Sequence, residues 1–309
     1  MVSRLLDLAR DEDLGPGFSD VTSDTFIHPS AILRCAVVAR RACVLAGLAT
    51  VHDLLIRFGC GGVVRVETLA HDGDEIEQGG VVAILEGHAR SILRVERTLL
   101  NLVGRLSGVA SLTREFVRAM GDDTSAQLLD TRKTTPGLRV LEKYAVVCGG
   151  GYSHRMGLYD AILVKDNHLA SRSLDELVEI WRRCAEAEEQ QWRVLARSGV
   201  PPEQIEWLAA SRFSQLSVEV EVDSLQQLEH VLGLNPGVIQ VVLLDNFSLD
   251  DLKAAVAMRQ RRGSEMLLEA SGGINLQNIR AVAQTGVDRI SVGALTHSAV
   301  SVDFGLDAL

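Results

Sequence analysis

Cysteine pairs, long apolar runs and an excess of positive charge are all missing from this sequence of 309 residues. The five cysteines are an odd number and none forms a C-x-x-C pair, so a disulfide framework and a zinc site are disfavoured and a reducing cytoplasm is expected. No run of about 18 apolar residues occurs, which argues against a membrane-spanning helix. The acidic residues close behind the N-terminus are unlike a secretory signal.

The net charge of −10 disfavours general nucleic-acid binding. The charge is uneven, because the range 97–165 holds ten Lys and Arg against six Asp and Glu, which makes it +4 and the remainder −14. A basic island in an acidic protein suggests a small anionic ligand, although chance clustering on solvated helices gives the same count. The dinucleotide-binding G-x-G-x-x-G and the Walker loop are also missing.

The N-terminal third of the chain has the mixed pattern of a small α/β domain. Apolar residues recur at helical spacing from 94 to 120, which predicts a long helix at the end of this region. Another face of that helix repeats small and polar residues, which suggests close approach by another chain or a ligand. These residues are Arg97, Asn101, Gly104 and Gly108.

From residue 126 onward, strand-like and helical stretches alternate, which implies a parallel sheet that is either open or closed into a barrel. The expected strands are 127–131, 161–165, 216–222, 241–245, 266–271 and 289–294. A connector at 171–215 has the pattern of two helices, the second starting at Pro201-Pro202. A packing appendage, a lid and an oligomer contact all remain open for this connector.

Parallel strands that are covered on both faces should be almost wholly apolar, yet these strands carry charges at or near their C-terminal ends. The charged residues are Asp130, Lys165, Glu219, Glu221, Asp245 and Glu269. In a β/α barrel the active site lies at that end, so a functional lumen is favoured over a purely structural network of ion pairs.

Acidic residues and glycine turns at the strand ends suggest a metal and a phosphate. Glu219 and Glu221 share one face of their strand, and with Asp245 on the next strand they offer oxygens suited to Mg²⁺. Alternatively, these carboxylates only neutralise nearby Lys and Arg. Turns at Ser271-Gly272-Gly273 and Gly293 follow the last two strands, where backbone N–H groups can approach an oxyanion, and predict a phosphate site.

The densest group of candidate ligand-binding residues lies in the segments 130–139, 149–155 and 165–168. Its cations suit a ligand with two carboxylates and a phosphate, because the guanidinium fork matches a carboxylate. The cations are Arg132, Arg139, His154, Arg155 and Lys165.

These stretches resemble the quinolinate phosphoribosyltransferase family over nearly the whole chain. The matching motifs include Glu96-Arg-Thr-Leu-Leu-Asn, the segments 130–139 and 149–168, Glu219-Val-Glu-Val, Leu243-Leu-Asp-Asn, Glu269-Ala-Ser-Gly-Gly and Gly293-Ala-Leu-Thr-His-Ser. The resemblance implies an α/β protein with a mixed α/β domain over 1–110, which makes dimer contacts, and an incomplete parallel β/α barrel over 111–309. In this scheme 171–215 is a helical insertion, and the extreme C-terminus packs back on the first domain.

The resemblance also implies the reaction, which is phosphoribosyl transfer from phosphoribosyl pyrophosphate (PRPP) to quinolinate with decarboxylation. The products are nicotinate mononucleotide, pyrophosphate and CO₂, as in de novo NAD biosynthesis. The family implies Mg²⁺ and a homodimer with shared active sites, with higher assembly left open. The implied catalytic residues are Lys133, Glu221 and Asp245, of which Glu221 and Asp245 are also the metal ligands. The implied substrate-binding residues are Arg97, borrowed by the partner subunit, and Arg132, His154, Arg155, Lys165, Ser271, Gly272, Gly293 and His297.

Three other functions fit parts of the same sequence. A pyrophosphorylase linked to molybdenum transport shares the fold, but the complete Lys165-Asp-Asn-His motif argues against it. A Schiff-base aldolase on a β/α barrel would use Lys133 or Lys165, whereas the many arginines and the glycine turns favour a phosphate-rich ligand. A non-catalytic anion-binding module leaves the carboxylates at the strand ends unexplained.

Overall fold

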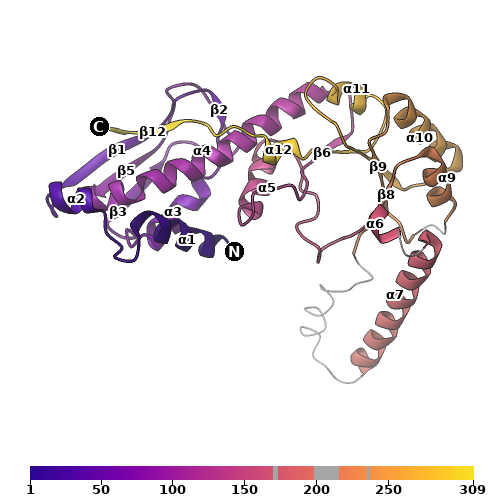
Figure 1. Cartoon of the computed structure of the whole chain (residues 1–309). Helices are drawn as coiled ribbons and strands as arrows, with labels where there is room; N and C mark the ends of the chain where they lie inside the picture. Colours follow the sequence, from indigo (N-terminus) through magenta and orange to yellow (C-terminus); the bar gives the residue numbers. More distant parts are fainter. Residues whose placement is uncertain (170–172, 198–215, 235–236) are drawn as a thin grey trace. The chain divides into compact units, whose positions relative to one another are not determined.

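The computed structural model describes residues 1–169, 173–197, 216–234 and 237–309 (Figure 1). The chain divides into two compact units. The first comprises Met1–Asp122, Leu128–His154 and Val292–Leu309, and the second comprises Asp123–Gln127 and Arg155–Ser291. The division predicted at residue 110 stays a prediction, and the Pro201-Pro202 helix start lies outside the described residues.

The first unit is built on a four-stranded sheet in the order β12-β1-β5-β3. The last strand of the chain pairs antiparallel with β1, and β1 and β3 both pair antiparallel with β5. A two-stranded ribbon, β2-β4, completes the sheet structure of this unit among the described residues. The strands are β1 (Ile32–Ala39), β2 (Cys43–Val44), β3 (Val64–Thr68), β4 (Glu75–Ile76), β5 (Val81–His88) and β12 (Phe304–Ala308).

The long helix predicted in the first unit is confirmed as α4 (Ala89–Met120). Its apolar residues Ile92, Val95, Leu99 and Val103 follow the three-to-four-residue spacing of one helix face and join the main apolar core of the unit. The remaining helices of the unit are α1 (Val2–Leu14), α2 (Val21–Phe26), the short 3₁₀ turn η1 (Leu48–Thr50), α3 (Val51–Arg57), α5 (Arg139–Cys148) and α12 (Ala294–His297).

A close approach to the small residues of α4 was predicted for another chain or a ligand, but at Gly104 it is made by the chain's own C-terminal segment. The backbone N–H of Val302 donates to the carbonyl of Gly104 over 2.9 Å. A methyl group placed on Gly104 would lie 2.5 Å from the carbonyl oxygen of Val302. A side chain at this position would therefore push the C-terminal segment off the helix.

The second unit carries the parallel strands β7 to β11, while β6 crosses the boundary between the two units after Gln127, and all six strands predicted from the sequence are present. The sheet has the order β6-β11-β10-β9-β8-β7, so β6 and β7 stand at its two ends. The pairs β7–β8, β8–β9, β9–β10 and β10–β11 are parallel. The strands are β6 (Gln127–Leu129), β7 (Ile162–Val164), β8 (Val218–Val222), β9 (Val241–Asp245), β10 (Leu267–Ser271) and β11 (Arg289–Ser291).

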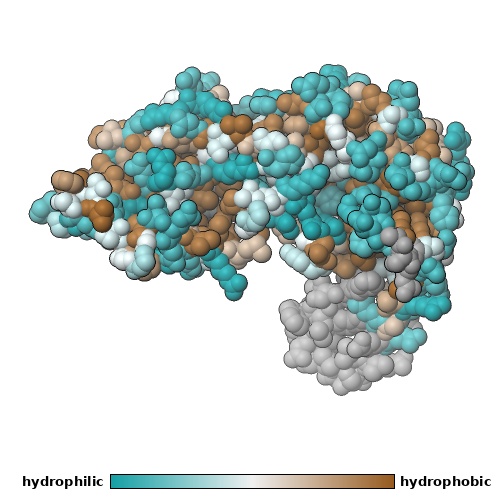
Figure 2. Space-filling view, in the orientation of Figure 1, coloured by the Kyte–Doolittle hydropathy of each residue, from teal (hydrophilic) through white to brown (hydrophobic). Residues whose placement is uncertain are grey.

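Helices alternate with these strands, as the sequence pattern predicted. They are α6 (Asp166–Leu169), α7 (Leu174–Arg197), α9 (Leu225–Gly233), α10 (Leu249–Arg262) and α11 (Ile279–Ala283). Helix α10 begins where the Ser248 side chain accepts the N–H of Asp251 and ends at Gly263, whose φ of 60° is left-handed. Its buried residues, Leu252, Ala255 and Val256, share one face at helical spacing. Figure 2 shows hydrophilic residues interspersed with hydrophobic ones on the surface of this region.

Together, the antiparallel sheet of the first unit and the parallel sheet of the second confirm the predicted fold class. The incomplete barrel agrees with a sheet in which β6 and β7 are the end strands. Among the described residues, no helix combines the length and the apolar character that crossing a membrane requires.

Replacing Gly104 with Ala tests the close approach of the C-terminal segment to α4. Helix propensity alone would make Gly104→Ala stabilising by about 1 kcal/mol. We expect a loss of about 1–3 kcal/mol in the free energy of unfolding instead, because the added methyl group overpacks against Val302. Urea unfolding measures it, with Glu115→Ala on the exposed side of α4 as the control. A stabilised Gly104→Ala protein would contradict the described contact.

Candidate active site

The strand register of the second unit places its charged side chains on one face of the sheet. Paired residues on neighbouring strands share a face, and so do residues two apart on one strand. Leu243 of β9 pairs with both Glu221 of β8 and Glu269 of β10, and Asp245 pairs with Ser271. The polar residues of this face in β8 to β11 are Glu219, Glu221, Asp245, Glu269, Ser271, Arg289 and Ser291.

The opposite face of the same strands is apolar. Val218, Val220 and Val222 of β8 are at most 4% exposed, as predicted for the second face of that strand. Burying each such side chain contributes about 1.5–3 kcal/mol. The apolar face therefore supplies the packing energy, and the charged face is not needed for it.

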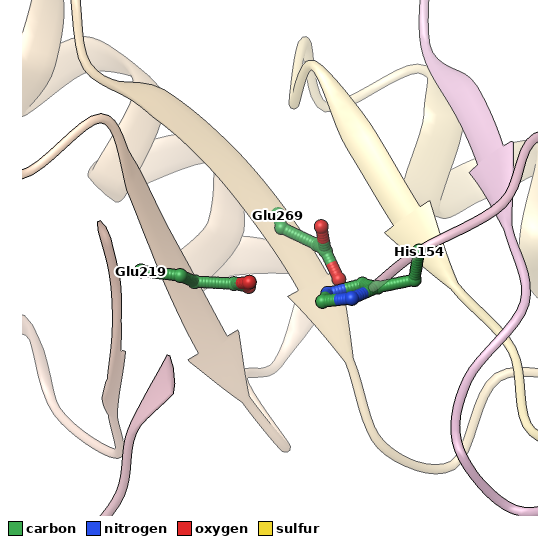
Figure 3. Close-up of side chains that lie close together, drawn as sticks. All are labelled: His154, Glu219 and Glu269. Atoms are coloured by element: carbon green, nitrogen blue, oxygen red, sulfur yellow. The ribbon is translucent and has the colours of Figure 1, made fainter. Parts of the chain in front are cut away.

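Two of the carboxylates on the charged face are deeply buried. Glu219 is 5% exposed and Glu269 is fully buried. Figure 3 shows the two side chains on their strands, and the register puts both on the charged face. Because burial of a carboxylate is costly, two of them on one sheet face indicate a functional site.

Lys165 and Glu221 form an ion pair between Nζ and Oε2 at the C-terminal ends of β7 and β8. The Lys165 side chain is 41% exposed and that of Glu221 is 16% exposed, so a ligand can reach the pair. The backbone N–H of Lys165 also donates to Nδ1 of His168 over 2.9 Å, which ties down the Lys165-Asp-Asn-His turn. The structure thus brings these two predicted site residues into direct contact.

Asn246 is a residue that the prediction missed. Its φ of 56° is unusual for a residue other than glycine, and its Nδ2 donates to Oδ2 of Asp245 over 2.8 Å. A methyl group on Gly272 would lie 2.6 Å from Cγ of Asn246, so Gly272 makes room for this amide. Asn following the strand-end Asp was the available sequence signal, because Asn tolerates the left-handed conformation.

In the first unit, a buried ion pair holds the backbone of His154. Lys143 is 1% exposed and Asp130 is fully buried, and the Lys143 ammonium contacts the Asp130 carboxylate. Lys143 Nζ also donates to the His154 carbonyl over 2.9 Å, and the His154 N–H donates to Asp130 over 2.9 Å. Burial raises the pKa of Asp130, and the Lys143 ammonium and the His154 N–H act against that shift.

Lys133, Gly293 and His297 come together in the first unit. A methyl group placed on Gly293 would lie 2.8 Å from Cδ of Lys133 and 3.3 Å from Nε2 of His297. The Lys133 side chain therefore lies over the glycine turn because Gly293 has no side chain. The backbone of Gly293 has an ordinary φ of −67°, so glycine is required here for space and not for conformation.

The remaining predicted arginines also have defined positions. Arg97 is exposed on α4. Nε of Arg132 is buried without a hydrogen-bond partner among the described residues, and a guanidinium in that state suits an anionic ligand. Arg155 donates from Nη1 to the carbonyl of Ala161 over 3.2 Å.

The predicted metal ligands, Glu221 and Asp245, already have partners for one oxygen each. Oε2 of Glu221 contacts the Lys165 ammonium, and Oδ2 of Asp245 accepts from Asn246. These carboxylates fit Mg²⁺, which prefers oxygen and commonly takes one or two carboxylates together with waters and substrate phosphates.

Comparison with known proteins matches nearly the whole chain to one family. The family model for the quinolinate phosphoribosyl transferase N-terminal domain matches residues 20–107. The C-terminal-domain model of the same family matches residues 109–197 and 203–307.

Individual relatives are similar over almost their full length. The chain is 39% identical to a nicotinate-nucleotide pyrophosphorylase [carboxylating] of Mycobacterium leprae, over 96% of this chain and 93% of the relative. It is 36% identical to a probable enzyme of the same name from Bacillus subtilis, over 96% and 89%. A crystal structure of nicotinate-nucleotide pyrophosphorylase from Ehrlichia chaffeensis covers 100% of this chain and 99% of its own, with 32% identity and a TM-score of 0.82.

Removing the Lys143 ammonium tests the buried pair. Lys143→Met leaves Asp130 buried without its cation, and we expect a loss of about 3–5 kcal/mol in unfolding free energy near neutral pH. Without Lys143 the folded-state pKa of Asp130 rises further above its unfolded value, so the folded variant binds the proton more tightly. Its stability therefore falls as pH rises from about 4, and the loss relative to wild type is smaller at acidic pH.

Urea unfolding of the wild type and Lys143→Met between about pH 4 and neutral pH measures how the stability difference depends on pH. The double variant Lys143→Met/Asp130→Asn is the control, because it removes both charges and should recover part of the stability. A loss that is the same at every pH would show that the Asp130 charge is not its cause.

Proposed function

Since this chain belongs to the quinolinate phosphoribosyltransferase family, we propose that it transfers the phosphoribosyl group of PRPP to quinolinate. The reaction releases pyrophosphate and CO₂ and yields nicotinate mononucleotide, a step of de novo NAD biosynthesis. The curated relatives are named for the carboxylating pyrophosphorylase, which favours this reaction over molybdenum transport and over an aldolase.

The observation that carries the proposal is the Lys133 side chain lying over Gly293 beside His297. A lysine at a glycine turn combines a mobile positive charge with exposed backbone N–H groups, which suits a phosphate or pyrophosphate oxygen. We assign Lys133 to the departing pyrophosphate. Gly293 and His297, like Ser271 and Gly272 of the second unit, are assigned to the phosphate groups of the substrate.

Quinolinate carries two carboxylates, and the proposed ligands for them are cations. Arg132 has a buried Nε without a partner among the described residues, and Lys165 is partly exposed. His154 and Arg155 follow one another on the segment that the Asp130–Lys143 pair holds in place. Holding two polyanions together against their repulsion is catalysis by positioning.

The acidic pair acts on the ribose. As the bond between ribose and pyrophosphate breaks, positive charge develops at the anomeric carbon. Glu221 and Asp245 would stabilise that charge, because each is fixed before the reaction by a neighbour, Lys165 or Asn246. The pyridine nitrogen then attacks, and the bond between the adjacent ring carbon and its carboxylate breaks to release CO₂. The electron pair stays on that ring carbon, where the neighbouring positive nitrogen stabilises it, until a proton from solvent adds to the carbon and gives nicotinate mononucleotide.

Mg²⁺ is the proposed metal, entering with PRPP. Glu221 and Asp245 would hold it, and it would supply positive charge that offsets the charge of the leaving pyrophosphate. The family resemblance further supports a cytoplasmic homodimer in which Arg97 is donated to the partner subunit's active site, and the exposure of Arg97 on α4 fits that role.

The direct test is to mix the purified protein with quinolinate, PRPP and Mg²⁺ and to follow nicotinate mononucleotide by chromatography. Nicotinate in place of quinolinate is the matched control, since it lacks the carboxylate that is lost. The proposal is supported if nicotinate mononucleotide forms with quinolinate but not with nicotinate. EDTA should abolish this product, and excess Mg²⁺ should restore it. Equal product from both substrates, or none from quinolinate, overturns it.

Two substitutions distinguish how much the charge of Lys133 and how much its position contribute to kcat. Lys133→Ala should lower kcat by about 10²–10³ with the fold intact, as loss of one transition-state donor does. Gly293→Ala keeps the lysine but displaces it, and we expect about a tenfold or greater loss in kcat, because a misplacement near 1 Å is that costly.

Gly17→Ala is the control for Gly293→Ala, because a methyl group there meets nothing within 4 Å. It should leave kcat and the melting temperature unchanged. Normal turnover in Gly293→Ala would remove the assigned role of the contact between Lys133 and the glycine turn.

A further inference from the structure

We propose that Arg105 and Glu142 are positioning residues for the reaction, an assignment that rests on the proposed function. They form a brace, defined here as Arg105, Glu142 and Thr296. The brace joins two segments of the first unit, 133–135 and 293–299. The first of these carries Lys133 and the second carries Gly293 and His297, so the brace sets where the Lys133 backbone lies relative to the glycine turn.

Glu142 is the centre of the brace. It lies in the first turn of α5 and is fully buried, and its carboxylate accepts hydrogen bonds from Arg105 and Thr135. Arg105 donates to Oε1 from Nη2 over 2.6 Å and from Nε over 3.1 Å. Thr135 donates its backbone N–H to Oε2 and its hydroxyl to Oε1, both over 2.9 Å. The carboxylate thus fixes the segment 133–135 two residues beyond Lys133.

Arg105 carries the connection to the other segment. Its guanidinium, on α4, is 21% exposed and donates from Nη1 to the carbonyl of Ala299 over 2.6 Å. It also donates from Nη2 to the carbonyl of Thr296. One planar fork therefore binds a carboxylate and two backbone carbonyls, a geometry that a lysine cannot reproduce.

A third link closes the brace. The Thr296 hydroxyl, fully buried, lies 2.9 Å from the carbonyl of Lys133 and 3.1 Å from the carbonyl of Gly293. Thr296 therefore joins directly the two residues whose side-chain contact the proposed function depends on.

The arrangement favours positioning over mere stability. A buried ion pair seldom adds net stability over apolar residues of similar volume, because desolvation offsets the attraction. Here Arg105 and Glu142 bond to backbone atoms of the segments 133–135 and 293–299 rather than to side chains of the core. Such bonds fix direction, and the two segments that they fix carry Lys133, Gly293 and His297.

The experiment compares Arg105→Met, Arg105→Lys and Thr296→Val with wild type. Thr296→Val is close in shape and removes only the hydroxyl link, so it guards against a failure to fold. Arg259→Met is the matched control, because Arg259 also pairs with a carboxylate, Asp288, and donates to a backbone carbonyl, Met266. We measure kcat, KM for each substrate, the dissociation constant of PRPP by calorimetry without quinolinate, and the melting temperature.

We expect Arg105→Met and Thr296→Val to lower kcat tenfold or more and to weaken PRPP binding severalfold, while KM for quinolinate changes less than threefold. Arg105→Lys should recover part of kcat. Arg259→Met should lower the melting temperature without changing kcat or PRPP binding.

The brace assignment is overturned if Arg105→Met and Thr296→Val lose only melting temperature, as the control does. If the wild type binds PRPP but is inactive, the proposed function is refuted and the brace assignment is not. The PRPP affinities of Arg105→Met and Thr296→Val then test the brace assignment. A wild type that neither reacts nor binds PRPP refutes both.

Discussion

The two-residue period of a parallel strand is the constraint on which the second unit depends. Because Val218, Val220 and Val222 must face the helices, Glu219 and Glu221 are forced onto the other face. Because the register aligns neighbouring strands, the same alternation places the charged residues of β8, β9, β10 and β11 on one face of the sheet. Packing energy and chemistry are thus assigned to opposite faces, so the strands can carry costly carboxylates without weakening the core.

In the first unit, several cationic site residues lie on loops, and these loops must be held in place. Here buried carboxylates act as anchors: Asp130 holds the His154 backbone through Lys143, and Glu142 holds the segment after Lys133. Both anchors bind backbone groups, so they determine where a loop runs rather than how tightly it packs. Loops that carry catalytic groups need such support, since a displacement of about 1 Å is enough to cost most of the rate.

Much of this follows from the sequence, because strands, helix alternation and strand-end charges are local patterns with known periods. What the sequence could not show are contacts between distant segments. The small residues of α4 predicted a close neighbour but not that it is the chain's own Val302, almost 200 residues away. Lys143 and Glu142 occur in an ordinary helical pattern, and only the fold reveals that both are buried. Asn246 was visible as a motif residue, but its left-handed backbone and its bond to Asp245 depend on the loop.

The central claim is that the charged sheet face exists for phosphoribosyl transfer and not for stability. The most direct measurement is nicotinate mononucleotide formation by the double variant Lys165→Met/Glu221→Met, run alongside its urea unfolding. The account predicts a folded protein with an unfolding free energy within about 1 kcal/mol of wild type or higher, and a turnover reduced by about 10² or more. A variant that is clearly destabilised yet turns over at the wild-type rate would contradict it.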